Sequence, residues 1–444
     1  MLRRELLASL AAAAALGALP RAARASARTP FGGRLVLHAP WPLAAIDPHR
    51  SDDATAAFFG PAVFDTLYAR DPDGTIVASL AEGDPAPEGA ALRVTLRNDL
   101  RFASGTRLDA RAAAAAIARA RARDASAWLA EVPAPKVDRG TLLFAMRDPR
   151  KLVRALASPM VAIVPPRFAP DRPDGTGPFR AEFGAAGMVL ARNVSSASGP
   201  AFLDAIEVRR ATDLATSLRA FESGADDVGW LGSFLHEPRA GARSFDAGAV
   251  GWAVLRTGRD LGTADVPGTA QSLADGVPHA ALASLVVGPP WEQSGSGWTG
   301  APVEMVVRED SPWLVELARA LAAALSSPGH EVRAAPVPAP EIASRRTSRG
   351  FALMLDVARP AGPGPLGALV GLATADDPTT AAALVRHPPR ADLPVRTMTR
   401  TMRLGVVGEM RLQGGRAPDV SLPSSPWGGV SWGDASRARP PLVR

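Results

Sequence analysis

Residues at spacings that could support catalysis are sparse in this sequence. It contains no HExxH, GxSxG or Walker phosphate-binding pattern, and no two histidines at the spacing of metal ligands. The six histidines are scattered, and the absence of cysteine excludes disulfides, thiolate chemistry and cysteine-based metal sites. Ser, His and Asp all occur, but no spacing singles out a nucleophile. We therefore predict a protein that is not an enzyme and that has no cofactor and no metal.

Two short runs match chemical motifs in letters only. Residues 362–367, GPGPLG, fit the dinucleotide-binding pattern GxGxxG, but they contain two prolines and no strand-to-helix context precedes them. We expect a loop there. Residues 71–74, DPDG, could be half of a calcium loop, but the other ligands of such a loop are missing. This run is predicted to be a tight turn.

The elements that would position any site are clearest in residues 92–121. Apolar and polar residues alternate from Leu92 to Leu96, which indicates a half-buried strand. Gly105 stands in a Ser-Gly-Thr turn, where it is free to adopt a positive φ. Asp109 is placed as the N-cap of an alanine-rich helix that runs to about residue 121. Taken alone, these signals predict only a strand, a turn and a helix.

The order of these signals closely resembles the peptide/nickel class of ABC-importer solute-binding proteins, extracellular solute-binding protein family 5. Members carry an LR-x4-F-x2-G-x2-L-x-A stretch in their first lobe. This pattern is matched by Leu96, Arg97, Phe102, Gly105, Leu108 and Ala110. A Gly-Thr-Gly-Pro-aromatic loop at residues 175–179 is a second hallmark. In the family the first stretch is scaffold that does not touch ligand, so it identifies the chain without locating a site.

The resemblance covers residues 34–260 strongly and 300–356 weakly. It implies an α/β, two-lobed periplasmic-binding-protein fold (type II-like) with an extra subdomain in the first lobe. The implied organisation is an export signal at 1–27, a first lobe at 28–250 with a subdomain at about 70–160, a second lobe at 251–420 and a C-terminal segment at 421–444. That last segment either folds back to the cleft or caps the first lobe.

The first 27 residues have the plan of an export signal. Arg3 and Arg4 precede a weakly apolar, alanine-rich run that ends near Leu19 and is followed by small residues. The run is too short to span a bilayer as a helix. The twin arginines favour the twin-arginine route, with an ordinary secretory signal as the alternative. Because a lipid anchor needs a cysteine after the signal, we expect a soluble periplasmic protein that is not lipid-anchored.

The formal charge of +6 does not indicate a nucleic-acid partner. Nearly all basic residues are arginine, which together with abundant Ala, Gly and Pro is typical of the codon bias of a GC-rich genome. No basic run is interleaved with aromatic residues, as single-strand nucleic-acid binding would require. The length of 444 residues allows two or three domains.

Five residues are candidates for a ligand-binding cleft. They are Trp41, Trp230, Leu231, Trp252 and Trp432. Trp230 and Leu231 follow an acidic helix-to-strand junction, and such junctions lie at the carboxyl ends of strands, where open α/β sheets place ligands. Packing in the core is the alternative for Trp230. The other three indoles could stack on a ligand or pack over it.

The resemblance implies a function in transport. The protein would capture a small solute, with an oligopeptide expected, in the interlobe cleft by hinge closure, and deliver it as a monomer to an ABC permease in the inner membrane. The acidic residue that pairs with a peptide's amino group in peptide-binding members has no position that the sequence identifies. The blurred second lobe and the length, short for the family, favour an alternative: a diverged non-transport periplasmic scaffold or sensor that retains the fold.

Overall fold

The computed structural model describes residues 29–230, 239–291, 295–389 and 394–438. Within them, ten strands form one sheet in the order β14-β13-β15-β12-β16-β11-β1-β10-β9-β8. The first-lobe strands are β1 (Arg34–Ala39), β8 (Phe179–Gly184), β9 (Gly187–Arg192), β10 (Ala205–Arg210) and β11 (Val228–Trp230). The remaining strands are β12 (Arg243–Thr257), β13 (Val303–Arg308), β14 (Val332–Val337), β15 (Leu353–Ala358) and β16 (Leu404–Arg416).

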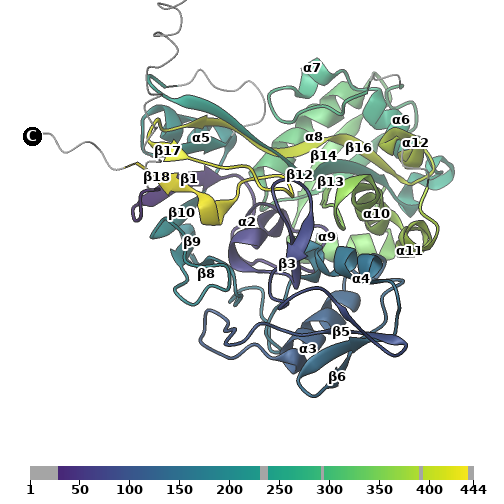
Figure 1. Cartoon of the computed structure of the whole chain (residues 1–444). Helices are drawn as coiled ribbons and strands as arrows, with labels where there is room; N and C mark the ends of the chain where they lie inside the picture. Colours follow the sequence, from purple (N-terminus) through teal and green to yellow (C-terminus); the bar gives the residue numbers. More distant parts are fainter. Residues whose placement is uncertain (1–28, 231–238, 292–294, 390–393, 439–444) are drawn as a thin grey trace, which may run out of the picture.

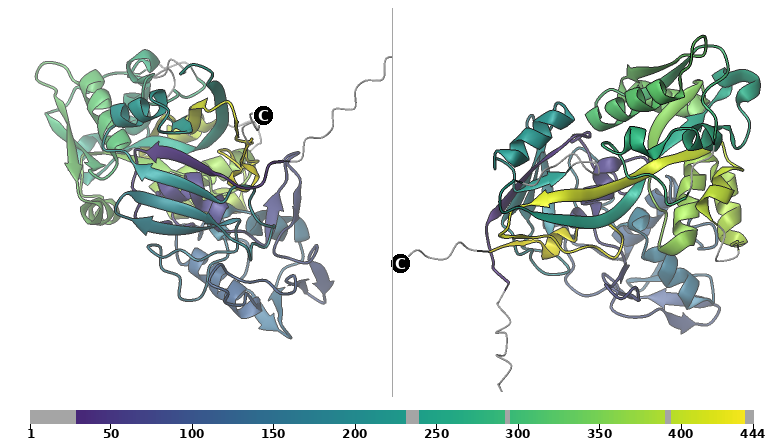
Figure 2. Two further views of the ribbon diagram at one scale, coloured as in Figure 1. Left: turned by 90° about the vertical axis from the view of Figure 1, so that its left-hand side faces the viewer. Right: turned by 90° about the horizontal axis from the view of Figure 1, so that it is seen from above.

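The two halves of the sheet are joined by the long antiparallel strands β12 and β16. One end of the pair lies beside β11, where Val228 pairs with Arg416, and the other end lies beside β15, where Thr257 pairs with Leu353. Figure 2 shows both strands running side by side from one lobe to the other. Strands that cross between lobes can bend as a hinge while each lobe keeps its own packing.

The first lobe carries a subdomain that hangs below the large sheet in Figure 1. A four-stranded sheet in the order β4-β5-β7-β6 packs against helix α3. The subdomain elements are β4 (Ala86–Glu88), β5 (Ala91–Val94), α3 (Ala110–Arg121), β6 (Lys136–Asp138), β7 (Thr141–Phe144), α4 (Pro149–Leu156) and the 3₁₀ turn η1 (Pro159–Val161). The other first-lobe elements are α2 (Ala54–Val63), β2 (Tyr68–Arg70), β3 (Ile76–Ala78) and α5 (Leu214–Glu222).

The local predictions for this subdomain are confirmed. Asp109 caps α3 by accepting the backbone N–H of Ala112 at 2.9 Å. Gly105 has a φ of +85°, as its turn requires. Residues 71–74 form the predicted tight turn: the N–H of Gly74 donates to the carbonyl of Asp71 at 3.0 Å, and its φ is +94°.

The second lobe surrounds β13, β14 and β15 with helices. They are α6 (Thr269–Asp275), α7 (His279–Leu282), α8 (Pro312–Leu325), α9 (Ala339–Ser348), α10 (Gly364–Asp376), α11 (Pro378–Arg386) and α12 (Val395–Thr399), with the 3₁₀ segment η2 (Arg259–Ala264). Helix α8 buries Trp313, Leu317 and Leu321 on one face, as the spacing of its apolar residues requires. Among the described residues, no helix is long and apolar enough to cross a membrane.

The expectation of a loop at residues 362–367 is wrong in part. Helix α10 begins at Gly364, six residues after the end of β15, so the run straddles a strand-to-helix connection. The two prolines do not prevent the helix, because Pro363 is its N-cap and Pro365 lies in its first turn, where no intrahelical N–H bond is needed.

The C-terminal segment returns to the first lobe. Its elements are β17 (Val420–Ser421), the 3₁₀ turn η3 (Trp432–Asp434) and β18 (Ser436–Arg437). Trp432 donates its indole N–H to the carbonyl of Phe58 in α2 at 2.8 Å, and Arg437 pairs with Asp227 at 3.0 Å. Figure 1 shows this segment beside β1, at the opposite end of the molecule from α12. The segment therefore packs against the first lobe although it follows the second in sequence.

Candidate functional site

A cavity of about 290 Å³ lies between the two lobes. The loop after β1 and the start of α2 wall it on one side. On the other side it is walled by the end of β13, the start of α8, helix α9 and the end of β15. Because β1 and β13 both end here, the cavity occupies the carboxyl edge of parallel strands, where open α/β sheets place ligands. The charged residues of the lining are Asp47, Arg50, Asp52, Asp53, Arg308, Asp310 and Arg346.

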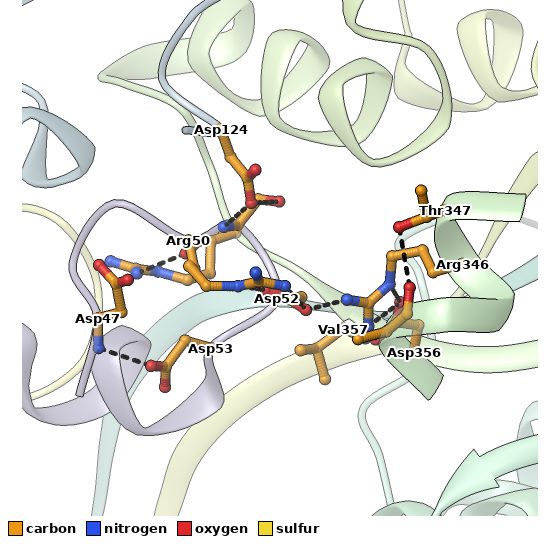
Figure 3. A network of polar contacts seen from close by, with 12 residues as sticks. Asp47, Arg50, Asp52, Asp53, Asp124, Arg346, Thr347, Asp356 and Val357 are labelled. Atoms are coloured by element: carbon orange, nitrogen blue, oxygen red, sulfur yellow. Dashed lines mark hydrogen bonds and ion pairs between the residues drawn. The ribbon is translucent and has the colours of Figure 1, made fainter. Parts of the chain in front are cut away.

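An ion-pair chain crosses the cavity from one lobe to the other (Figure 3). Arg50 donates through Nε and Nη2 to both carboxylate oxygens of Asp52, each at 2.7 Å. Across the cleft, Arg346 of α9 donates through Nε and Nη2 to Asp356 of β15, at 2.9 and 3.0 Å. The third nitrogen of Arg346 reaches Asp52. Asp52 therefore links the lobes, because it accepts from an arginine on each side.

Both members of the interlobe pair are charged at neutral pH. Burial by itself raises the pKa of Asp52, but the positive charges of Arg346 and Arg50 outweigh it and hold that pKa below its usual range. Burial lowers the pKa of Arg346, but the carboxylates of Asp356 and Asp52 outweigh it and raise that pKa. The side chains of Asp52 and Arg346 are 12% and 18% exposed, so water screens the pair only weakly.

Backbone groups also join the lobes in this structure. Arg359 lies just after β15. Its backbone N–H donates to the carbonyl of Ser51 at 2.9 Å, and its side-chain Nη1 donates to the carbonyl of Arg50 at 3.0 Å. At the start of α8, the N–H of Trp313 donates to the carbonyl of Pro40 at 3.1 Å. The lobes are therefore in direct contact on both sides of the cavity.

The loop that carries Asp52 is held on the side away from the cavity by contacts of Asp47 and His49 with Arg119. Arg119 of α3 donates to both carboxylate oxygens of Asp47, at 2.8 and 2.7 Å, and lies 2.7 Å from Nδ1 of His49. Nε2 of His49 lies 2.8 Å from the carbonyl oxygen of Ala162. Burial, with the nearby charge of Arg119, lowers the pKa of His49 to about 4. The ring is therefore neutral at pH 7, with Nε2 as donor and Nδ1 as acceptor.

Among the five predicted cleft residues, the structure describes the surroundings of the side chains of Trp41, Trp252 and Trp432. Trp41 and Trp432 are both 1% exposed and covered by protein: Trp41 stacks on Phe58 at 4.3 Å, and Trp432 stacks on Phe59 at 5.2 Å. Trp252 is half-buried in β12, between β15 and β16. Trp230 ends β11, opposite Gly414, and Leu231 lies outside the described residues. Their contact with ligand stays a prediction.

Sequence reasoning did not select the charged residues that line the cavity. Asp52 and Arg346 are 294 residues apart, and no local pattern marks either as a partner of the other. The feature of the sequence that could have identified them is their position after strands: Asp47 and Asp52 follow the first strand, and Ser311 follows a strand of the second lobe. The rule that ligands bind beyond the carboxyl ends of parallel strands would have selected these loops.

Comparisons with known proteins identify the fold. Residues 75–236 match the family model described as bacterial extracellular solute-binding proteins, family 5 Middle. No curated protein sequence matches the chain. The chain is similar to the solved structure of NikA from Staphylococcus aureus in complex with Ni(L-His)2, with a TM-score of 0.68 and 14% identity over 91% of this chain and 99% of that chain.

Two peptide complexes show the same fold. DppA from Helicobacter pylori with the peptide STSA gives a TM-score of 0.69 and 14% identity over 92% of this chain and 99% of that one. AppA from Bacillus subtilis with a nonapeptide gives 0.68 and 12% identity over 93% and 100%. The resemblance to the peptide/nickel class is confirmed. The protein has the two-lobed α/β fold of the family 5 extracellular solute-binding proteins.

Proposed function

We propose that this protein is the solute-binding component of an ABC importer and that it holds its solute in the interlobe cavity. The observation that carries the proposal is the position of that cavity, walled by both lobes at the carboxyl ends of parallel strands. The crossing strands β12 and β16 support a hinge mechanism, in which the lobes separate to admit the solute and close over it. The closed form then docks on a permease of the inner membrane.

The solute is small. A volume of about 290 Å³ is at the lower end of the roughly 300–1,000 Å³ typical of small-molecule sites. Structures of this fold include complexes with peptides and with Ni(L-His)2. A short peptide, or a solute of similar size, suits the cavity better than a long peptide. The protein works as a periplasmic monomer, exported by its N-terminal signal.

The experiment combines ligand discovery with a conformational readout. Native protein purified from periplasm is analysed by mass spectrometry for a bound solute, and ligand-free protein is titrated with short peptides, nickel chelates and oligosaccharides. Binding by hinge closure predicts a smaller radius of gyration in X-ray scattering and a change in tryptophan fluorescence. If no member of the pool changes either signal and no solute co-purifies, transport is contradicted.

A second candidate function is a scaffold or sensor that retains the fold without transport. The observation in its favour is that the charged walls of the cavity already pair with each other, as in the chain from Arg50 through Asp52 and Arg346 to Asp356. A protein that is closed by its own side chains needs no solute to close. Scattering that gives the same compact radius of gyration with and without every probe would favour this candidate.

A further inference from the structure

An arginine of the second lobe is buried against the first. Arg359 directly follows β15 and is 4% exposed. Its guanidinium donates through Nη1 to carbonyls of the first-lobe loop, that of Arg50 at 3.0 Å and that of Pro48 at 3.5 Å. Its backbone N–H donates to the carbonyl of the next loop residue, Ser51. It forms no ion pair with any residue that the structure describes, although a buried cation usually has a carboxylate beside it.

Carboxylates of the first lobe compensate this buried charge at longer range. Burial lowers the pKa of Arg359, and this effect is opposed by the negative charges of four carboxylates, Asp53, Asp47, Asp52 and Asp124. Asp47 and Asp52 are already paired with other arginines. Asp53 and Asp124 form no ion pair among the described residues. The first-lobe loop therefore combines free carbonyl oxygens with uncompensated negative charge, and both favour a cation.

The first lobe holds this loop in place without the second lobe. The N–H of Asp47 donates to Asp53 at 2.8 Å, and the N–H and the hydroxyl of Ser51 both donate to Asp124 at 2.8 Å. Figure 3 shows these three carboxylates around the loop. Because all of these bonds lie within one lobe, the carbonyls of residues 48–51 keep their positions when the lobes separate. The loop is therefore preorganised for a cation that has several N–H donors.

The residues after Arg359 also fit closely into the first lobe. The hydroxyl of Ser158, which is fully buried, donates to the carbonyl of Ala361. Gly362 packs so closely on Trp128 that a Cβ there would clash with the indole ring. Ser158 and Trp128 both belong to the first-lobe subdomain. Residues 359–362 therefore contact the first lobe as a short bound peptide would, through a side chain, a carbonyl and a close approach of the backbone.

We propose that the loop at residues 48–51 is a guanidinium-binding site and that Arg359 is its tethered occupant, which holds the lobes together when no solute is present. The crossing strands keep Arg359 near the site, so its effective concentration there far exceeds that of a free cation. A separate cavity of about 210 Å³, which Arg359 also lines, gives a small cation access to the site. This inference rests on the hinge of the proposed function and on no property of the solute.

The test empties the site with Arg359→Ala and refills it with a free cation. X-ray scattering of the ligand-free variant should give a larger radius of gyration than that of the wild-type protein. Methylguanidinium at about 10 mM, which suits a millimolar site and is far below unfolding concentrations, should restore the smaller value, because the closed form buries the cation on both sides. Tetramethylammonium at the same concentration should not, because it has no N–H donor. The matched control is Arg403→Ala, whose partner Asp265 lies in the second lobe, and it should stay compact.

A second variant, Gly362→Ala, keeps Arg359 and tests the contact of the segment if Arg359→Ala does not fold. Its methyl group clashes with Trp128 only when the lobes are in contact, so the radius of gyration should rise and methylguanidinium should not reverse the change. Either variant folded and as compact as the wild-type protein would overturn the role of residues 359–362. Equal compaction of Arg359→Ala by both cations would overturn the guanidinium site. Neither outcome bears on solute capture, which the separate titration with the solute pool decides.

Discussion

His49 shows how a single residue makes the stability of the cavity loop depend on pH. Protonation would put an N–H on Nδ1, 2.7 Å from the guanidinium of Arg119, inside the protein. The pKa of His49 is therefore about 4 in the folded state, against 6.5 in the unfolded chain. Between these values the unfolded chain binds the proton and the folded chain does not, so stability falls as the pH falls. The loss should reach about 3 kcal/mol by pH 4.

Urea unfolding at several pH values between about 6.5 and 4 measures this loss. In His49→Gln, the side-chain amide can still donate to the carbonyl of Ala162 but does not titrate, so the free energy of unfolding should fall less over that range. His387→Gln, at an exposed histidine, should behave like the wild-type protein. An equally steep fall in His49→Gln would show that another group is responsible.

Gly105 tests the assignment of the family motif to scaffold. A Cβ there would meet nothing within 4 Å, so the cost of Gly105→Val is the backbone strain at a φ of +85°. We expect a loss of about 1–3 kcal/mol in the free energy of unfolding. Gly184→Val is the matched control, because that position is equally open but lacks a positive φ. Solute affinity of the folded Gly105→Val protein should not change; lost affinity with an unaltered melting temperature would contradict the scaffold role.

At the scale of elements, the interlobe pair controls how α9 and the loop before α2 approach each other. Asp52→Asn removes the charge that attracts Arg346. The conformation with the two lobes in contact should therefore lose about 1–3 kcal/mol of stability relative to the conformation with the lobes apart. X-ray scattering should then give a larger radius of gyration for the ligand-free variant. The wild-type protein should expand in the same way on addition of salt, although less, since the pair is mostly buried.

The control for this pair is Glu341→Gln, which removes a carboxylate that α9 presents to Arg345 outside the cavity. Its radius of gyration should match that of the wild-type protein. A double-mutant cycle with Arg346→Gln isolates the Asp52–Arg346 contribution from that of Asp356. If the cycle gives no interaction energy, the pair does not hold the lobes together.

At the scale of the whole molecule, residues 1–28 lie outside the described residues, so the export signal stays a prediction. Replacing Arg3 and Arg4 with lysine should leave precursor in the cytoplasm if the twin-arginine route is used. Fractionation with an antibody to the protein measures this. Lysine at Arg21 and Arg24 is the control and should leave export unchanged. A normal periplasmic yield from the first variant would indicate the general secretory route.

Several features could be predicted from the sequence because their causes act within a few residues. The cap at Asp109 concerns one N–H three residues away, and the turn at Gly105 concerns one φ angle. The apolar stripe of α8 follows from the helical period. The start of α10 is not predicted by the sequence pattern, because two prolines usually end a helix. Here Pro363 is the N-cap and Pro365 lies in the first turn, and both positions are compatible with a helix.

The candidate site was decided by tertiary structure alone. Asp52 lies in the loop after β1 and Arg346 lies in α9, which follows β14. They meet because the large sheet places these two segments on either side of the cavity, and 294 residues separate them in the chain. The indoles of Trp41 and Trp432, predicted to lie at the cleft, stack on phenylalanines of α2. A charge or an indole has the same local sequence signature whether it faces a cavity or a neighbouring helix. What it faces is set by the packing of distant elements, and the sequence pattern around it does not contain that information.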